Sequence, residues 1–155
     1  LLTALIIAVF LRIYVYEFVQ VKGNSMTPTL INKEFVFIEK INADKPKRGE
    51  ILIVRFPEDE NYYIKRLVGV PGDEISVKDG QLFLNGIAQE ENYIPEKIAY
   101  EMEEIRIPKG MYFVLGDNRN DSWDSHMESV GLIPAEDIVG HAVFVAWPFP
   151  RIRSL

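Results

Sequence analysis

The feature that most limits the possible folds of this chain is a succession of short apolar segments with strand character. They are rich in β-branched and aromatic residues, several alternate apolar with polar positions, and proline and glycine punctuate the chain between them. Asp79-Gly80 lies between two alternating runs, which is a strong hairpin signal. We therefore expect a mainly β fold, antiparallel and partly closed like a β-barrel, over residues 18–155. The segments are 18–21, 34–40, 50–56, 61–70, the hairpin 74–86, 111–117 and 138–147.

Two stretches depart from this pattern. Residues 87–104 are acidic and show no clear period, so we expect a small cap or insertion outside the main sheet. Residues 133–137 (IPAED) are typical of a short helical turn.

Composition limits the chemistry. The 155 residues suffice for one domain with a real core. The net charge of −6 argues against a nucleic-acid partner, which would select a basic surface. Because there is no cysteine, a disulfide, a thiolate nucleophile and a cysteine-type zinc site are excluded. The histidines, His126 and His141, lack the spacing of a zinc motif, so we expect no metal site.

The chain begins with an uncharged apolar stretch, LLTALIIAVFL, at residues 1–11. A helix needs about 20 such residues to cross a bilayer, so this stretch alone is too short. The first residue is not methionine, and Tyr14 and Tyr16 suit the interface between membrane and water. We therefore expect residues 1–17 to be a truncated membrane anchor. The alternative is a buried or amphipathic helix within a soluble domain.

A serine and a lysine form the first candidate site. Ser25, within NSMTPTL (24–30), is by itself typical of a turn. Lys65 lies in the strand-like YYIKRLVG, where alternation directs Lys65 and Arg66 to opposite faces. A lysine held among apolar neighbours has a lowered pKa, and its neutral amine could accept the proton of a serine hydroxyl. Alternatively, the Lys65 stem follows the sheet and its amine stays in water.

The polar loop, GDNRNDSWDSH (116–126), is the second candidate. It is either a solvated turn or a hydrogen-bonded scaffold that orients a base. The spacing of a calcium-binding loop is absent. A Ser-His-Asp triad using His126 or His141 stays open, although the chain has no G-x-S-x-G motif.

Three blocks occur in a fixed order along the chain: S-M-x-P-T-L, then I-K-R-x-x-G-x-P-G-D, then G-D-N-R-x-x-S-x-D-S. Together with GEILIVRF (49–56) and the apolar start, they strongly resemble the bacterial type I signal peptidases. The resemblance spans nearly the whole chain, and the three blocks together are specific. Members of this family are membrane-anchored Ser-Lys endopeptidases that remove signal peptides from exported proteins.

The resemblance implies a role for each matching residue. Ser25 matches the nucleophile and Lys65 the general base. Ser122 matches a serine that hydrogen-bonds the lysine and helps to aim it. Met26, next to the nucleophile, is expected to form part of the wall of the substrate pocket.

The polar loop and the far face of the strand match the family as well, with two departures. Arg66 resembles the partner of Asp117, and Asp124 the acidic residue that supports the loop. Some relatives carry a serine at the position of Gly23, and its hydroxyl helps to bind the oxyanion. Because glycine has no hydroxyl, we expect the backbone N–H of Ser25 to donate to the oxyanion in this chain. Many relatives carry arginine at the position of His126. The His126 side chain could still pair with Asp124, but its charge would depend on pH.

The resemblance also implies partners and a location. The expected substrates are precursor proteins with signal peptides, with small side chains at the first and third positions before the cut. We expect contact with membrane lipid, a catalytic domain on the extracytoplasmic face of the cell membrane, and no cofactor. Two alternatives stay open: a soluble Ser-Lys self-cleaving regulator, and a catalytically idle anchored homologue. The chain lacks the Ala-Gly or Cys-Gly pair of such regulators.

Overall fold

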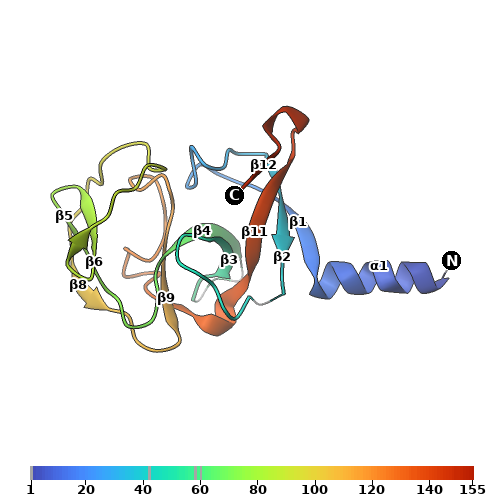
Figure 1. The fold of residues 1–155 in the computed structure, drawn as a ribbon, viewed down its shortest axis with the longest axis horizontal. Coiled ribbons are helices and arrows are strands. Elements are labelled where there is room, and N and C mark those ends of the chain that lie inside the picture. The colour runs from blue at the N-terminus through green and yellow to red at the C-terminus, as the bar shows by residue number, and fades with distance from the viewer. Residues whose placement is uncertain (1, 42, 58, 60) are drawn as a thin grey trace.

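The computed structural model describes residues 2–41, 43–57, 59 and 61–155. The described chain begins with helix α1, Leu2–Tyr14, and continues almost entirely as antiparallel strands in two sheets. In Figure 1, α1 extends away from the sheets on the side opposite the smaller sheet. The predicted mainly β, antiparallel fold is confirmed.

The larger sheet has the strand order β1-β2-β11-β3-β4-β9-β10, with β12 paired to β11. It curls without closing, and β1 and β10 form its edges. Strand β4 lies inside the sheet, paired with β3 and β9, and so gives its side chains rigid positions. The bounds are β1 Tyr16–Gln20, β2 Phe35–Glu39, β3 Ile51–Arg55, β4 Tyr62–Gly69, β9 Met111–Leu115, β10 Ile133–Pro134, β11 Ile138–Trp147 and β12 Arg153–Ser154.

The smaller sheet has the order β7-β6-β5-β8. The predicted hairpin forms β5 and β6, which pair up to Lys78 opposite Gln81. Residues 87–104 lie outside the larger sheet, but they are no separate cap, because both of their ends are strands of the smaller sheet. The bounds are β5 Glu74–Lys78, β6 Gln81–Leu84, β7 Ile87–Ala88 and β8 Met102–Arg106.

Apolar residues in and directly after the acidic segment explain this placement. Ile98 is buried against β5 and β6, and Tyr100, Met102 and Ile105 pack against the same cluster. Acidic residues separate these apolar positions, so the sequence shows no regular apolar period here. The insertion therefore begins at β5, well before residue 87, and the segment joining β7 to β8 (the connecting segment, residues 89–101) crosses back toward the larger sheet.

The remaining short elements lie near the C-terminal end. The predicted helical turn at 133–137 is split between β10 and the 3₁₀ turn η1, Ala135–Asp137, and a second 3₁₀ turn, η2, spans Phe149–Arg151. Helix α1 has 13 residues. Among the described residues, no helix combines the length and the apolar character needed to cross a membrane.

Candidate active site

Ser25 and Lys65 meet although 40 positions separate them in the sequence. Ser25 lies in a turn after β1, in which the Thr27 N–H donates to the Asn24 carbonyl at 3.0 Å. Lys65 is in the middle of β4, opposite Leu52 of β3. The Lys65 amine Nζ donates a hydrogen bond to Ser25 Oγ at 2.8 Å. A turn residue and an interior strand residue therefore form the pair.

Burial controls the charge of Lys65. The residue is 2 % exposed. Burial lowers the pKa of Lys65 to about 8, and the nearby carboxylates Asp124 and Asp117 oppose this shift. A lysine with an ordinary pKa is almost entirely protonated at neutral pH, whereas this one has an appreciable neutral fraction. Its neutral amine has the hydrogen-bond distance and the basicity that a general base needs.

The pair opens into a groove between β1 and β4. The groove has a volume of about 440 Å³, and Gly23, Ser25, Met26 and Lys65 are among its lining residues. A neighbouring hollow of about 480 Å³ continues along β1 and shares Val19, Gln20, Lys22 and Tyr62 with the groove. β1 is an edge strand, so the groove runs along an edge of the larger sheet.

Arg66, the next residue of β4, points away from Lys65, as the alternation predicts. Its Nε and one terminal nitrogen donate to the Asp117 carboxylate at 2.8 and 2.7 Å. Asp117 is fully buried and also accepts the Thr29 hydroxyl at 2.5 Å. The predicted ion pair is therefore present, and it joins β4, the polar loop and the segment that follows Ser25.

We expect Arg66→Met to lower the free energy of unfolding by about 3–5 kcal/mol, because it leaves the Asp117 carboxylate buried without its partner. Urea unfolding followed by tryptophan fluorescence measures this change. Arg55→Met is the matched control, because Arg55 forms an exposed pair with Asp137 at 2.6 Å. Its expected cost is only about 0–1 kcal/mol. Equal losses in the two variants would contradict the structural role of Asp117.

Ser122 corrects one prediction. Its hydroxyl Oγ is buried and has no hydrogen-bond partner in the part of the chain that the structure describes, so it does not bind Lys65. The reason is packing: Oγ is turned against Gly116, where a Cβ atom would overlap both Ser122 and the Ser25 carbonyl. The hydrogen bond of Lys65 goes to Ser25 instead.

Asp124 and His126 stabilise the polar loop. The buried Asp124 carboxylate accepts the Gly116 N–H at 2.8 Å and lies 2.6 Å from His126 Nδ1. The imidazole stacks on Tyr100 of the connecting segment, with ring centroids 4.1 Å apart. The predicted pairing of His126 with Asp124 is thus present, and the hydroxyl of Ser25 meets Lys65 rather than His126.

The backbone conformation at position 23 favours glycine. Its φ of +85° lies in a region that residues with side chains rarely adopt. Its N–H donates to Asn32 Oδ1 at 3.2 Å, which fixes the approach to Ser25. A serine at this position would be strained in the observed backbone.

The polar loop holds Ser25 through residues that sequence reasoning did not single out. The Asn118 N–H donates to the Ser25 carbonyl at 2.9 Å, and the Asn118 side chain donates to the Asn24 carbonyl at 3.2 Å. Asn118 and Thr29 lie within sequence blocks already identified, but nothing in those blocks indicates that Asn118 binds the backbone around Ser25 or that Thr29 binds the Asp117 carboxylate. Within the described ranges, no cluster of three or more His, Asp or Glu residues could hold a metal ion.

Comparison with known proteins identifies the family to which the chain belongs. The family model described as "Signal peptidase, peptidase S26" matches residues 1–147. A probable signal peptidase I-2 of Synechocystis sp. is 40% identical over 100% of this chain and 74% of its own length. The signal peptidase I P of Bacillus subtilis subsp. natto is 39% identical over 99% of this chain and 89% of its own.

A plant protein and a crystal structure are also similar. The chloroplastic thylakoidal processing peptidase 1 of Arabidopsis thaliana is 40% identical over 98% of this chain, which spans 48% of that protein. The crystal structure of a signal peptidase I from Enterococcus faecalis has a TM-score of 0.57 and 29% identity, over 64% of this chain and 97% of the crystallised chain. The chain therefore belongs to the signal peptidase family, peptidase S26, and is a serine endopeptidase of the signal peptidase I type.

Proposed function

We propose that this chain cleaves signal peptides from exported precursor proteins with Ser25 as nucleophile and Lys65 as general base. The observation that carries this proposal is the 2.8 Å hydrogen bond between Lys65 Nζ and Ser25 Oγ. It occurs at a lysine that is buried, whose pKa is lowered to about 8, and which lines a groove along an edge strand. Proximity, basicity and access to a peptide therefore coincide at one serine.

The reaction proceeds in two stages. Neutral Lys65 takes the proton of Ser25, whose oxygen attacks the scissile carbonyl carbon, and the backbone N–H of Ser25 binds the developing oxyanion. The lysine then gives its proton to the departing amine, so that the mature protein leaves and the signal peptide stays as an ester on Ser25. Water, deprotonated by the same amine, attacks this ester. The amine then returns the proton to Ser25 Oγ as the ester bond breaks, and the signal peptide leaves with a new carboxylate.

The groove accounts for the class of substrate. An extended peptide adds to the free edge of β1, so its backbone provides most of the hydrogen bonds while alternate side chains enter the groove. The groove near Ser25 is bounded by Met26, which is buried, and by Ile64 of β4. Small residues before the cut fit between such walls without displacing Lys65.

The proposal includes a membrane location. Leu2, Leu5, Ile6 and Ile7 of α1 are all more than half exposed, and apolar residues gathered on a projecting helix favour contact with lipid. We propose that α1 belongs to an anchor and that the sheets act on the extracytoplasmic face; the boundary expected at residue 17 moves to before Tyr16, because Tyr16 and Glu17 pair with β2 as part of β1. Because β1 follows α1 directly, the groove along β1 would then lie close to the bilayer surface, where a signal peptide leaves the membrane.

The test is incubation with a precursor that has alanine at the first and third positions before the cut. We expect one cleavage, between signal peptide and mature protein, identified by mass spectrometry. A matched precursor with phenylalanine at the first position should be cleaved about 10²-fold more slowly, because the proposed pocket between Met26 and Ile64 would have to open to admit the ring. Failure to cleave either precursor would favour the idle homologue. Cleavage of the chain itself and not of the precursor would favour the self-cleaving regulator.

A further inference from the structure

A buried ion pair ties the connecting segment (89–101) to the polar loop. The two terminal nitrogens of Arg119 each donate to one carboxylate oxygen of Glu91, both at 2.6 Å. The side chains of Arg119 and Glu91 are 0% and 5% exposed. Burying two charges costs much of what their attraction gains, so such a pair is weak evidence for stability. The geometry that it fixes is therefore the informative feature.

Arg119 carries this geometry to the backbone beside Ser25. Its Nε donates to the Gly116 carbonyl at 3.1 Å, while the Gly116 N–H is held by Asp124. Gly116 packs so closely against the Ser25 carbonyl that a Cβ atom would overlap it. Glu91 is thus connected to Ser25 through two residues, Arg119 and Gly116.

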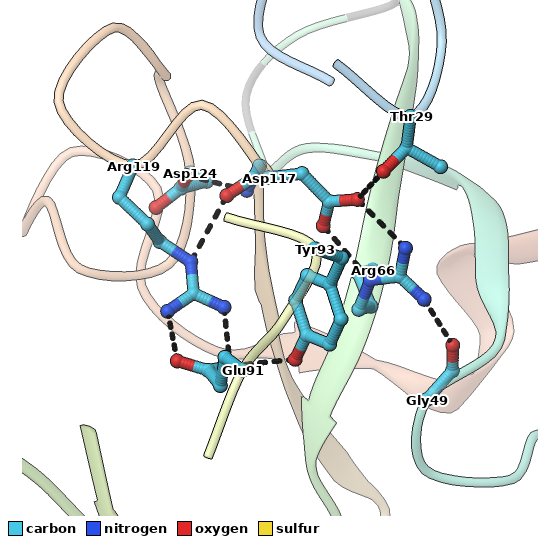
Figure 2. A network of polar contacts seen from close by, with 9 residues as sticks. Thr29, Gly49, Arg66, Glu91, Tyr93, Asp117, Arg119 and Asp124 are labelled. Atoms are coloured by element: carbon cyan, nitrogen blue, oxygen red, sulfur yellow. Dashed lines mark hydrogen bonds and ion pairs between the residues drawn. The ribbon is translucent and has the colours of Figure 1, made fainter. Parts of the chain in front are cut away.

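Tyr93 makes a second connection from the same segment. Its hydroxyl donates to Glu91 at 2.6 Å, and its ring lies 4.1 Å from Arg66 Cζ. Figure 2 shows Tyr93 between Arg119 and Arg66, with Asp117 above it bound to Arg66 and Thr29. The carboxylate of Glu91 is therefore the point at which both connections to the segment around Ser25 meet.

We propose that Glu91 is a positioning residue for the cleavage reaction, assisted by Tyr93. This inference rests on the proposed function of Ser25 and Lys65. Two parallel hydrogen bonds to one carboxylate fix the plane of the Arg119 guanidinium group, and this plane sets the direction in which Nε holds Gly116. Gly116 and Asn118 in turn hold the Ser25 carbonyl, and with it the distance from Ser25 Oγ to Lys65. The connecting segment, which joins two strands of the smaller sheet, would thereby control the geometry of a site in the larger sheet.

Glu91→Gln tests this proposal, because the amide keeps the shape of the side chain but offers only one acceptor oxygen. We expect the single-turnover rate constant of precursor cleavage, at saturating enzyme, to fall roughly tenfold, less than the 10²-fold that a 1 Å misplacement can cost. The enzyme concentration for half-maximal rate should change by less than about twofold, since the groove is untouched. At saturation this rate constant describes the bound complex, so partial unfolding does not lower it.

Asp73→Asn is the matched control. Asp73 is also a buried carboxylate bound to an arginine, but its partners, Arg48, Asn85 and the Val70 N–H, all lie outside the polar loop. This variant should keep the wild-type rate constant. Tyr93→Phe removes a single hydroxyl and should lower the rate constant about threefold, so it serves as the test if Glu91→Gln does not fold.

Amide hydrogen exchange provides a measurement that does not depend on cleavage. The Asn118 N–H, bonded to the Ser25 carbonyl, should exchange at least about fivefold faster in Glu91→Gln and at the wild-type rate in Asp73→Asn. An unchanged rate constant or unchanged exchange in Glu91→Gln would overturn the proposal. A wild-type protein that cleaves no precursor would instead contradict the proposed function, and the exchange comparison would still decide whether Glu91 holds the loop.

Discussion

Replacing Ser25 with alanine is expected to lower kcat for precursor cleavage on the order of 10⁶-fold, the size of effect seen when a catalytic serine is removed from a serine protease. The variant loses the atom that forms the ester, and the Ser122 hydroxyl does not take its place, since it is turned against Gly116. The fold should persist, because Ser25 is held mainly through its backbone carbonyl. Cleavage of a labelled precursor over hours measures the residual rate.

The control is Ser129→Ala, which removes an exposed hydroxyl that accepts the Trp123 indole N–H at 3.1 Å. This variant should cleave at the wild-type rate. Retention of more than about 1% of wild-type activity by Ser25→Ala would exclude Ser25 as the nucleophile, because oxyanion and binding contributions alone leave far less.

The fold was largely predictable because strand signals in this chain are local. Alternation, β-branched residues and the Asp79-Gly80 turn located the main strands to within a few residues. The smaller sheet was the exception, since Ile98, Tyr100, Met102 and Ile105 pack against residues of the preceding hairpin. These packing contacts depend on the tertiary structure, so the local periodicity of residues 87–104 does not predict them.

In the candidate site, too, the features set by local sequence were predictable and those set by tertiary packing were not. Alternation along β4 correctly separated Lys65 from Arg66, because side-chain direction in a strand depends only on sequence position. The predicted bond from Ser122 to Lys65 was wrong, because it depended on how tightly the loop packs against Gly116. The contacts of Glu91 and Tyr93 with Arg119 and Arg66 could not be foreseen, since they join the connecting segment to the polar loop and to β4, which are distant in the sequence.

Lys65 gives the second large effect. Both Lys65→Met and Lys65→Arg should lower kcat by a factor on the order of 10⁵–10⁶, because methionine has no basic atom and arginine stays charged. In the wild type, kcat/KM should rise about tenfold per pH unit below the pKa of Lys65, about 8, and level off above it. A flat profile between pH 6 and 9, or an active arginine variant, would contradict the role of a neutral amine.

The same residue should cost stability at neutral pH. The pKa of Lys65 is lowered from 10.5 in the unfolded chain to about 8 in the folded one, so the unfolded state binds more protons between these values. The free energy of unfolding therefore rises as pH increases from about 8 to 10.5. Well below pH 8 both states carry the proton and the folded state carries the full cost of a buried charge.

Lys65→Met removes this cost, so we expect it to unfold less readily than the wild type at pH 7, by on the order of 2 kcal/mol. The difference should shrink steadily toward pH 10.5, where the wild-type amine is neutral in both states. Urea unfolding at several pH values measures it, and the exposed Lys78→Met is the control that should show no such trend. A methionine variant that is less stable than the wild type at every pH would mean that the charged Lys65 amine is well solvated. The pKa of Lys65 would then not be lowered by burial, and the argument for Lys65 as the general base would fail.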